Sequence, residues 1–434
     1  MSTSACSETL KVLLLAAALC LAHGVFELTF DKRAGVMYLR EAVLVVVVLG
    51  AVWVIVRKPA LLRLRILTFS LLYVVAFVGL STLLAWLWFR QPPLFGLLEE
   101  RRMFDVLWLF VMIGLVCILK PDMSTIVKAY CVAGLVLSLY SALYYFSVIT
   151  DNEVSGVFIE QHYYADDDPR NQTRYVLSTT LPLVVIPLAL ASWRDQKRAS
   201  ECLLLLSALV ALLFTVVCVN QTRTLMAFIV MISTLVVLQR SSRFGLPVAV
   251  LLMLLVSVSG ATLLLTSSNE KVRWMFDSML HGQQVRLNTI AIILTELKAG
   301  WYWGHGALSV QFNRGFLTIY NENFWLNDVG KLGLFYRFGF LLVPFVAFYI
   351  YVARYLWRAS SAYRCAYFQV VFWIYMMLLV NPMGNIAQLG AVELGLLTGW
   401  LINHESDASR SAVSSIAGRS RGFRVESGAQ AARA

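Results

Sequence analysis

The sequence predicts an all-α membrane protein with about twelve transmembrane helices. Apolar residues make up 59% of the 434 positions and charged residues only 14%. A water-soluble domain of this size cannot bury that much apolar surface, so the solvent must be lipid. The apolar runs are about twenty residues long without a two-residue alternation, which is typical of helices and not of barrel strands.

The apolar runs define the expected spans in chain order. We interpret the first run as an uncleaved span, because it continues to Phe30 without the small-residue cleavage site of a signal peptide. The expected spans are Lys11–Phe30, Met37–Val56, Ile66–Phe89, Met103–Leu119, Ser124–Ile149, Tyr175–Trp193, Cys202–Val219, Thr224–Leu238, Phe244–Leu265, Leu332–Tyr351, Tyr363–Leu379 and Gln388–Ile402.

Clusters of Lys and Arg in alternate short links set the expected orientation. The positive-inside rule places these links, and both termini, in the cytoplasm. We expect one transmembrane domain over residues 1–404 and a disordered basic cytoplasmic tail over residues 405–434, which holds too few apolar residues to fold. The arginines of the tail suit contact with anionic membrane lipids. The cytoplasmic cations are Arg57, Lys58, Arg63, Arg65, Lys120, Lys128, Arg194, Lys197, Arg198, Arg240, Arg243, Arg354, Arg358 and Arg364.

One outer link, over about residues 266–331, is much longer than the others. Long links without secondary structure are uncommon unless they carry a function. This one contains a helix-like run from Thr289 to Lys298 and the sequence Gly304-His305-Gly306. We therefore expect the spans to hold this loop over a site at the outer membrane surface.

Many of the 36 Lys and Arg residues fall on the expected outer side, which the positive-inside rule disfavours. A cationic outer face suits an anionic substrate such as a lipid pyrophosphate. Alternatively, these side chains pair with outer acidic residues, among them Glu99 and Glu100, or snorkel to lipid headgroups. The outer cations are Lys32, Arg33, Arg40, Arg90, Arg101, Arg102, Arg170, Arg174, Arg223, Lys271, Arg273, Arg286, Lys298, Arg314, Lys331 and Arg337.

Two arginines are the strongest candidates to hold phosphate. Arg223 lies in a very short polar link between two apolar runs, so its guanidinium is kept at the outer membrane boundary. Arg286 precedes the helix-like run of the large loop, and a helix N-terminus favours a phosphate. A guanidinium matches phosphate oxygens with two parallel hydrogen bonds. The structural alternatives are a snorkelling turn residue for Arg223 and an exposed loop residue for Arg286.

Asp328 is the candidate general base, because a carboxylate at the start of a span is partly desolvated and its pKa rises toward a useful value. Alternatively, Asn327 or Asp328 caps the helix that begins near Leu332. His305 could be a catalytic or substrate-binding imidazole, although Gly-x-Gly is more often a tight turn. His162 lies beside tyrosines in an outer loop, where aromatic faces suit sugar rings.

The remaining polar features indicate neither a disulfide framework nor a zinc site. None of the seven cysteines lies in CxxC or Cys/His ligand spacing. The run from Asp166 to Asp168 could bind a divalent cation, but adjacent carboxylates are more often a solvated loop. His23 and Glu393 lie inside spans, as structural polar groups or as part of a pathway, and the sequence does not decide between these.

Several short motifs, taken in order, resemble those of the O-antigen ligase and O-antigen polymerase superfamily of bacterial envelope glycosyltransferases. The resemblance covers most of residues 10–400, and the order of the motifs carries it, since each is short. The matching parts are Val154–Phe158, Leu181–Leu183, Gln221–Arg223, Arg286 with the helix after it, Gly304–Gly306, and Asn327–Gly330 with a downstream Gly339.

The resemblance implies transfer of glycan from an undecaprenyl-pyrophosphate-linked donor at the periplasmic face of the bacterial inner membrane, without a cofactor, nucleotide sugar or metal. Arg223 and Arg286 would hold the pyrophosphate, with Asp328 as base. His162, Arg174, His305, Asn327 and Arg337 would contact substrate. Ligases of the superfamily typically have a His-Asn pair where Leu326-Asn327-Asp328 stands here, so this form looks more like a polymerase.

Three functions therefore compete. The first is a Wzy-type polysaccharide polymerase with a lipid-linked acceptor, with which a chain-length regulator could associate. The second is an O-antigen ligase that uses lipid A core as acceptor. The third is a transporter without chemistry, but the sequence shows no convincing internal repeat, and its polar residues gather at one outer face. No nucleic-acid partner is expected.

Overall fold

A computed structural model describes residues 3–25, 36–150, 178–193, 198–220, 223–241, 286–321, 324–363, 365–380 and 390–405. All regular secondary structure in these ranges is helical, which confirms the all-α fold class. The expected span Phe244–Leu265, nearly all of the expected tail, His162 and Arg174 lie outside the described residues.

Within the described part of the chain, five helical stretches are long and apolar enough to cross a membrane, judged by length and composition. Shorter apolar helices accompany them, so the chain has the composition and helix lengths of a membrane protein. The count of about twelve spans stays a prediction. The five stretches are Arg65–Phe89, Arg101–Leu119, Met123–Phe146, Ala199–Asn220 and Gly330–Tyr363, and the shorter helices are Ala42–Arg57, Thr180–Ser192, Leu225–Arg240 and Ala366–Val380.

The helices keep the order expected from the apolar runs. Two further helices cover residues 286–298 and 391–405. The α-helices are α1 (Thr3–Ala22), α2 (Val36–Arg57), α3 (Arg65–Phe89), α4 (Pro93–Glu99), α5 (Trp108–Leu119), α6 (Met123–Thr150), α7 (Thr180–Ser192), α8 (Ala199–Phe214), α9 (Arg223–Ser241), α12 (Phe316–Ile319), α13 (Gly330–Phe338), α14 (Leu342–Tyr363) and α15 (Ala366–Val380). Short 3-10 segments are η2 (Pro59–Arg63), η3 (Arg101–Leu107), η7 (Leu326–Val329) and η8 (Gly339–Leu341), and η6 (Thr215–Asn220) is a π-helix.

Several helix starts and ends that the charge pattern predicts on the cytoplasmic side lie together at one end of the helical bundle. The Glu8 carboxylate of α1 accepts a hydrogen bond of 2.9 Å from Thr125 at the start of α6. Lys128 of α6 lies 2.8 Å from Glu201 at the start of α8. The Asn403 amide donates to the carbonyl of Val116 near the end of α5. These contacts join starts and ends of helices as the alternating topology requires, and we call this the N-terminal end.

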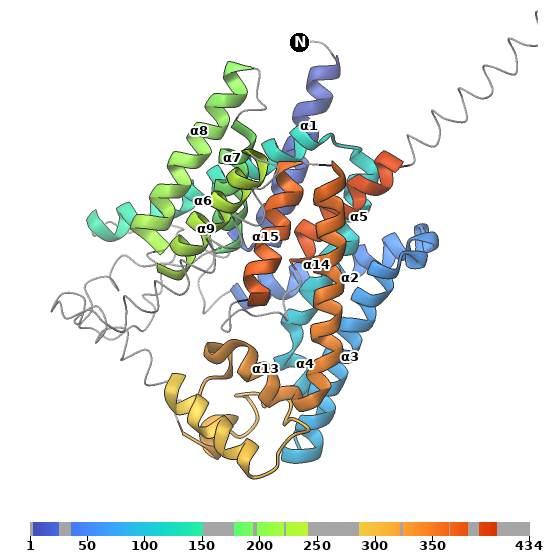
Figure 1. The fold of residues 1–434 in the computed structure, drawn as a ribbon, viewed down its shortest axis with the longest axis vertical. Coiled ribbons are helices and arrows are strands. Elements are labelled where there is room, and N and C mark those ends of the chain that lie inside the picture. The colour runs from blue at the N-terminus through green and yellow to red at the C-terminus, as the bar shows by residue number, and fades with distance from the viewer. Residues whose placement is uncertain are drawn as a thin grey trace, which may run out of the picture.

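The opposite end carries residues 286–321 and 324–330, and we call it the loop end. In Figure 1 this yellow-to-orange segment lies at the bottom, beside α13, α4 and the lower part of α3, far from the N-terminus. The expected span Leu332–Tyr351 is not one straight helix, because Gly339 adopts φ +55° between α13 and α14. The helix after the loop begins at Gly330, slightly earlier than expected.

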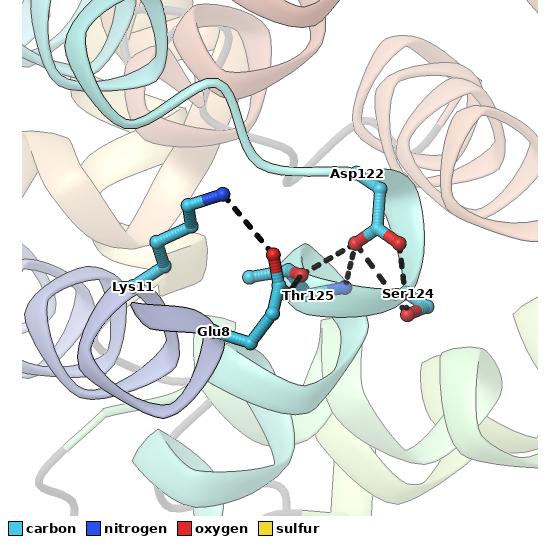
Figure 2. Close-up of polar contacts among 5 residues, drawn as sticks. All are labelled: Glu8, Lys11, Asp122, Ser124 and Thr125. Atoms are coloured by element: carbon cyan, nitrogen blue, oxygen red, sulfur yellow. Dashed lines mark hydrogen bonds and ion pairs between the residues drawn. The ribbon is translucent and has the colours of Figure 1, made fainter. Parts of the chain in front are cut away.

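Asp122 caps α6 at the N-terminal end (Figure 2). Its carboxylate accepts a hydrogen bond of 2.8 Å from the backbone N–H of Thr125, as an N-cap residue does. Burial pushes the pKa of Asp122 up, but hydrogen bonds from Thr125 and Ser124 outweigh it and hold the pKa below its ordinary value. The Thr125 hydroxyl lies between the carboxylates of Asp122 and Glu8, and Lys11 donates to Glu8. This cluster ties α1 to α6.

Small residues let helix 391–405 approach α5 closely. Gly395 and Gly399 stand one turn apart, the small-xxx-small spacing that brings membrane helices together. A Cβ added at Gly395 would lie 2.7 Å from the carbonyl oxygen of Leu109 and 2.8 Å from the Cβ of Met112. Since a backbone atom of α5 is in the way, any side chain at this position must push the two helices apart.

We predict that Gly395→Ala destabilises the protein by about 1–3 kcal/mol through overpacking. The matched control is Gly79→Ala in α3, where an added Cβ meets no atom within 4 Å. There the better helix propensity of Ala leaves stability unchanged or raises it. Thermal unfolding of the purified protein in detergent measures both. A Gly395→Ala midpoint at or above that of Gly79→Ala would contradict this packing.

Candidate functional site at the loop end

The loop end has a small apolar core of its own, separate from the core of the helical bundle. Ile293 of helix 286–298 packs with Phe324, Val329 and Tyr336, all buried. The backbone N–H of Trp325 donates to the buried hydroxyl of Thr289, at 3.0 Å. The large loop of the sequence is therefore, in its described part, a folded unit built around helix 286–298.

Glycines allow this unit to dock on α3 and α13 through the main chain. Gly304 and Gly306 adopt φ of +85° and +74°, which confirms the tight turn that Gly-x-Gly suggests. The backbone N–H groups of His305 and Gly306 donate to the carbonyls of Tyr336 and Arg337, at 3.0 and 2.8 Å. A Cβ at Gly306 would overlap the carbonyl oxygen of Ser81. The turn therefore lies directly against the backbones of both helices.

Two buried polar side chains at the end of α3 complete the docking. The Ser81 hydroxyl accepts a hydrogen bond from the N–H of Ala307, at 3.0 Å. The Gln91 amide donates to the carbonyl of Ala307 and accepts from the N–H of Ser309, at 3.2 and 2.7 Å. Ser81 and Gln91 are at most 1% exposed, so these bonds satisfy backbone groups that docking removes from water.

An ion pair stands beneath the turn. Arg337 of α13 contacts the carboxylate of Glu100 through Nη2, and the two side chains are 14% and 4% exposed. The same Glu100 oxygen accepts a hydrogen bond from the Ser81 hydroxyl. The positive charge of Arg337 thus has an acidic partner within the protein, which is one of the two explanations that the sequence allows for the predicted outer cations.

His305 is enclosed by aromatic rings. Its imidazole stacks on Tyr336 at a centroid distance of 4.4 Å and on Trp301 at 4.6 Å, and only 3% of the residue is exposed. Burial lowers the pKa of His305 to about 4, so the ring is uncharged at neutral pH. Its Nδ1 atom has no hydrogen-bond partner among the described residues. The ring acts here as part of the packing that holds the turn.

A hydrogen-bond chain links helix 286–298 to α13. The hydroxyls of Tyr320 and Tyr336 lie 2.8 Å apart, and the Tyr320 hydroxyl donates to the carboxylate of Glu296 at 3.3 Å. Burial raises the pKa of Tyr320 to about 12, so it keeps its proton at neutral pH. The Asn288 amide donates to Asn321 at 2.9 Å. Helix 286–298 is thus linked to α13 through Tyr320.

The unit and the adjoining end of α3 carry exposed tryptophans. Trp88, Trp303 and Trp325 are 46%, 62% and 50% exposed, and Trp88 lies 4.5 Å from Trp301 between ring centroids. Tryptophan and tyrosine are enriched where membrane helices meet the headgroup region. The loop end is therefore suited to lie at the membrane–water interface.

The structure describes the backbones of the predicted catalytic residues, of which Arg286, Asn327 and Asp328 belong to the loop end. Arg223 is the first residue of α9, which follows the π-helix η6, and such π segments are frequent at functional sites. Arg286 begins the described part of helix 286–298 and is exposed. Asn327 and Asp328 lie in η7, directly before α13. The side chains of Arg223, Asn327 and Asp328 are not described, so their assigned roles stay predictions.

Sequence reasoning missed Ser81 and Gln91 as partners of the loop. Both lie in or beside an apolar helix far from the loop in the chain, and no local signal links them to Ala307 or Ser309. The sequence offers Glu100 as a partner for the predicted outer cations, but no local pattern pairs it with Arg337. No group of three or more His, Cys, Asp or Glu residues suited to a metal occurs in the described ranges.

No protein-family model matches the chain, and a search of curated proteins found no match either.

We predict that Arg337→Met lowers stability by about 3–5 kcal/mol, because it leaves the buried Glu100 carboxylate without its cation. The double variant Arg337→Met/Glu100→Gln removes both charges and should regain most of the loss. Thermal unfolding of the single and double variants measures this coupling. If the double variant unfolds at a lower temperature than Arg337→Met, the two losses of stability simply add. That result would contradict an ion pair between Arg337 and Glu100.

Proposed function

We propose that the chain is a polysaccharide polymerase of the bacterial inner membrane. The growing glycan on its undecaprenyl-pyrophosphate carrier is transferred to a sugar hydroxyl of a lipid-linked repeat unit. In this proposal the loop end faces the periplasm and the N-terminal end faces the cytoplasm. The motifs that resemble the O-antigen polymerase and ligase superfamily support the reaction class.

The observation that carries the proposal is the folded unit at one end of an apolar helical bundle. The unit is docked on α3 and α13 by buried polar contacts, and the described part of helix 286–298 begins with an exposed arginine. The proposal places Arg223, at the start of α9, at the same end. A lipid-linked pyrophosphate lies at the headgroup level, which is where this end of the bundle presents its exposed tryptophans.

The proposed chemistry needs charge stabilisation and proton removal. Arg223 and Arg286 hold the pyrophosphate and stabilise the negative charge that develops as it leaves. The acceptor hydroxyl attacks the anomeric carbon as the bond to the pyrophosphate oxygen breaks. Attack opposite the leaving group inverts the anomeric centre, because the scheme contains no covalent enzyme intermediate. A carboxylate at the loop end accepts the hydroxyl proton, and the sequence names Asp328 for this.

We predict that Arg223→Ala and Arg286→Ala each slow glycan elongation by about 100-fold or more. Removal of one hydrogen-bond donor that stabilises transition-state charge typically lowers a rate by about this factor. Purified protein is reconstituted with defined undecaprenyl-pyrophosphate-linked repeat units, and product lengths are separated by electrophoresis. Arg314→Ala is the matched control, because it removes another exposed loop cation outside the proposed site.

The same assay separates the competing functions. Wild-type elongation of the lipid-linked repeat supports the polymerase. Transfer only to added lipid A core would overturn it in favour of a ligase, and absence of any transfer would refute a glycosyltransferase. Wild-type product lengths in Arg223→Ala would refute the role given to that arginine.

A further inference from the structure

Trp325 presents an exposed indole ring on a fixed main chain at the loop end. The residue is 50% exposed, whereas Phe324 before it and Val329 after it are 3% and 2% exposed and belong to the small apolar core of this unit. Buried neighbours on both sides hold the backbone in place. A tryptophan presented in this way offers a large contact area to a ligand at a low cost in conformational entropy.

The main chain of Trp325 is bonded to the helix that carries Arg286. The Trp325 N–H donates to the hydroxyl of Thr289 at 3.0 Å, and Thr289 is fully buried in this contact. Arg286 stands three residues before Thr289, and residues three apart are neighbours on one face of a helix. The helix face that contacts Trp325 therefore continues, one turn further, to the exposed Arg286.

Asp328, the proposed base, follows Trp325 closely in the chain. Trp325 is the N-cap residue of η7, the 3-10 segment that contains Asp328. A 3-10 helix rises about 2 Å per residue, so three residues along it advance the main chain by about 6 Å. The indole is therefore attached within one helical turn of the proposed base. Through Thr289 it also lies one turn from the proposed phosphate ligand, Arg286.

Amide side chains lie beside the same place. Asn288 precedes Thr289, and its amide donates to the side chain of Asn321 at 2.9 Å at the surface. The Asn321 carbonyl accepts a hydrogen bond of 3.3 Å from the N–H of Phe324, so this turn leads directly into Trp325. An aromatic ring beside amide and guanidinium groups suits a sugar, because the ring contacts C–H groups while the polar groups bind hydroxyls.

Two other exposed tryptophans of the loop end have apolar neighbours instead. Trp88 follows the exposed Leu87 near the end of α3. Trp303 follows Tyr302, whose carbonyl accepts a hydrogen bond from the N–H of the exposed Phe340. Apolar surroundings of this kind suit a tryptophan that anchors a protein at the membrane interface. The amide side chains beside Trp325 favour a polar ligand over lipid tails.

We propose that the Trp325 indole stacks on the sugar ring that is bonded to the pyrophosphate of the lipid-linked donor. The inference rests on the proposed function and names the sugar subsite of that same site. Sugar C–H groups carry a partial positive charge and meet the negative face of the aromatic ring. The stacked ring places the anomeric carbon beside the pyrophosphate that Arg286 holds. Trp325 is a substrate-binding residue, and Asp328 keeps the role of base.

The test measures binding of two probes to the full-length protein in lipid nanodiscs. One probe is undecaprenyl pyrophosphate, and the other is the same carrier with a defined repeat unit attached. The wild type should bind the linked repeat at least about 10-fold more tightly. Trp325→Leu keeps an apolar side chain without a π face, so it should lose about 10-fold in affinity for the linked repeat only. Trp325→Phe keeps an aromatic face and should retain most of the preference.

Elongation kinetics with the same linked repeat give a second measurement. Trp325→Leu should raise KM by about 10-fold and leave kcat within about 3-fold of wild type, because the stack binds the ground state and the transition state alike. Trp303→Leu is the matched control, because it removes an exposed indole that has apolar neighbours. Its KM and its preference between the two probes should equal those of wild type.

Equal affinities of Trp325→Leu and Trp325→Phe for the linked repeat would overturn the inference. So would equal losses for both probes, which would show that the ring contacts the lipid carrier, or a wild type without any preference for the linked repeat. If Trp325→Leu does not fold, Trp325→Gln takes its place with the same expected losses. A wild type that prefers the linked repeat but does not elongate it would refute the polymerase and leave the sugar subsite standing.

Discussion

The close approach of the Gly304–Gly306 turn to the backbones of α3 and α13 is the constraint on which the loop end depends. No side chain fits at Gly306, since its Cβ would overlap the carbonyl oxygen of Ser81. The main-chain hydrogen bonds from His305 and Gly306 to α13 can form only when the turn lies this close to the helix. The buried side chains of Ser81 and Gln91 then satisfy the backbone groups of Ala307 and Ser309, so these groups keep hydrogen bonds when the polar segment lies on apolar helices.

The docked loop end has two kinds of polar groups, those that hold the unit together and those that stay open to a ligand. Arg337 and Glu100 neutralise each other under the turn, and His305 is an uncharged ring between Tyr336 and Trp301. These groups hold the unit together. Arg286 stays exposed on the helix that the unit supports, and its charge is open to an anionic ligand. Inside the bundle, His23 and Glu393 form a buried pair, and the two atoms in contact have no hydrogen-bond partner among the described residues. The proposed function assigns the phosphate to the exposed cation and the hydroxyl proton to Asp328.

Composition and spacing predicted the helical fold class, because burial of so many apolar residues leaves few alternatives. The contact between Lys128 and Glu201 agrees with the prediction that the links before α6 and α8 lie on the same side. The break of the tenth expected span at Gly339 was not predicted, since a glycine in an apolar run carries no sign of its φ angle. Contacts such as Ser81 with Ala307, or His23 with Glu393, join distant parts of the chain and depend on packing that no local pattern encodes.

The most direct test of the docked loop compares Gly306→Ala with Gly300→Ala by limited proteolysis of the purified protein. Both glycines have positive φ, so both substitutions strain the backbone, but an added Cβ at Gly300 meets no atom within 4 Å. The account predicts that Gly306→Ala releases the loop, with rapid cleavage within residues 299–321, while Gly300→Ala is cut at nearly the wild-type rate. Equal cleavage of the two variants would contradict docking of this turn on α3.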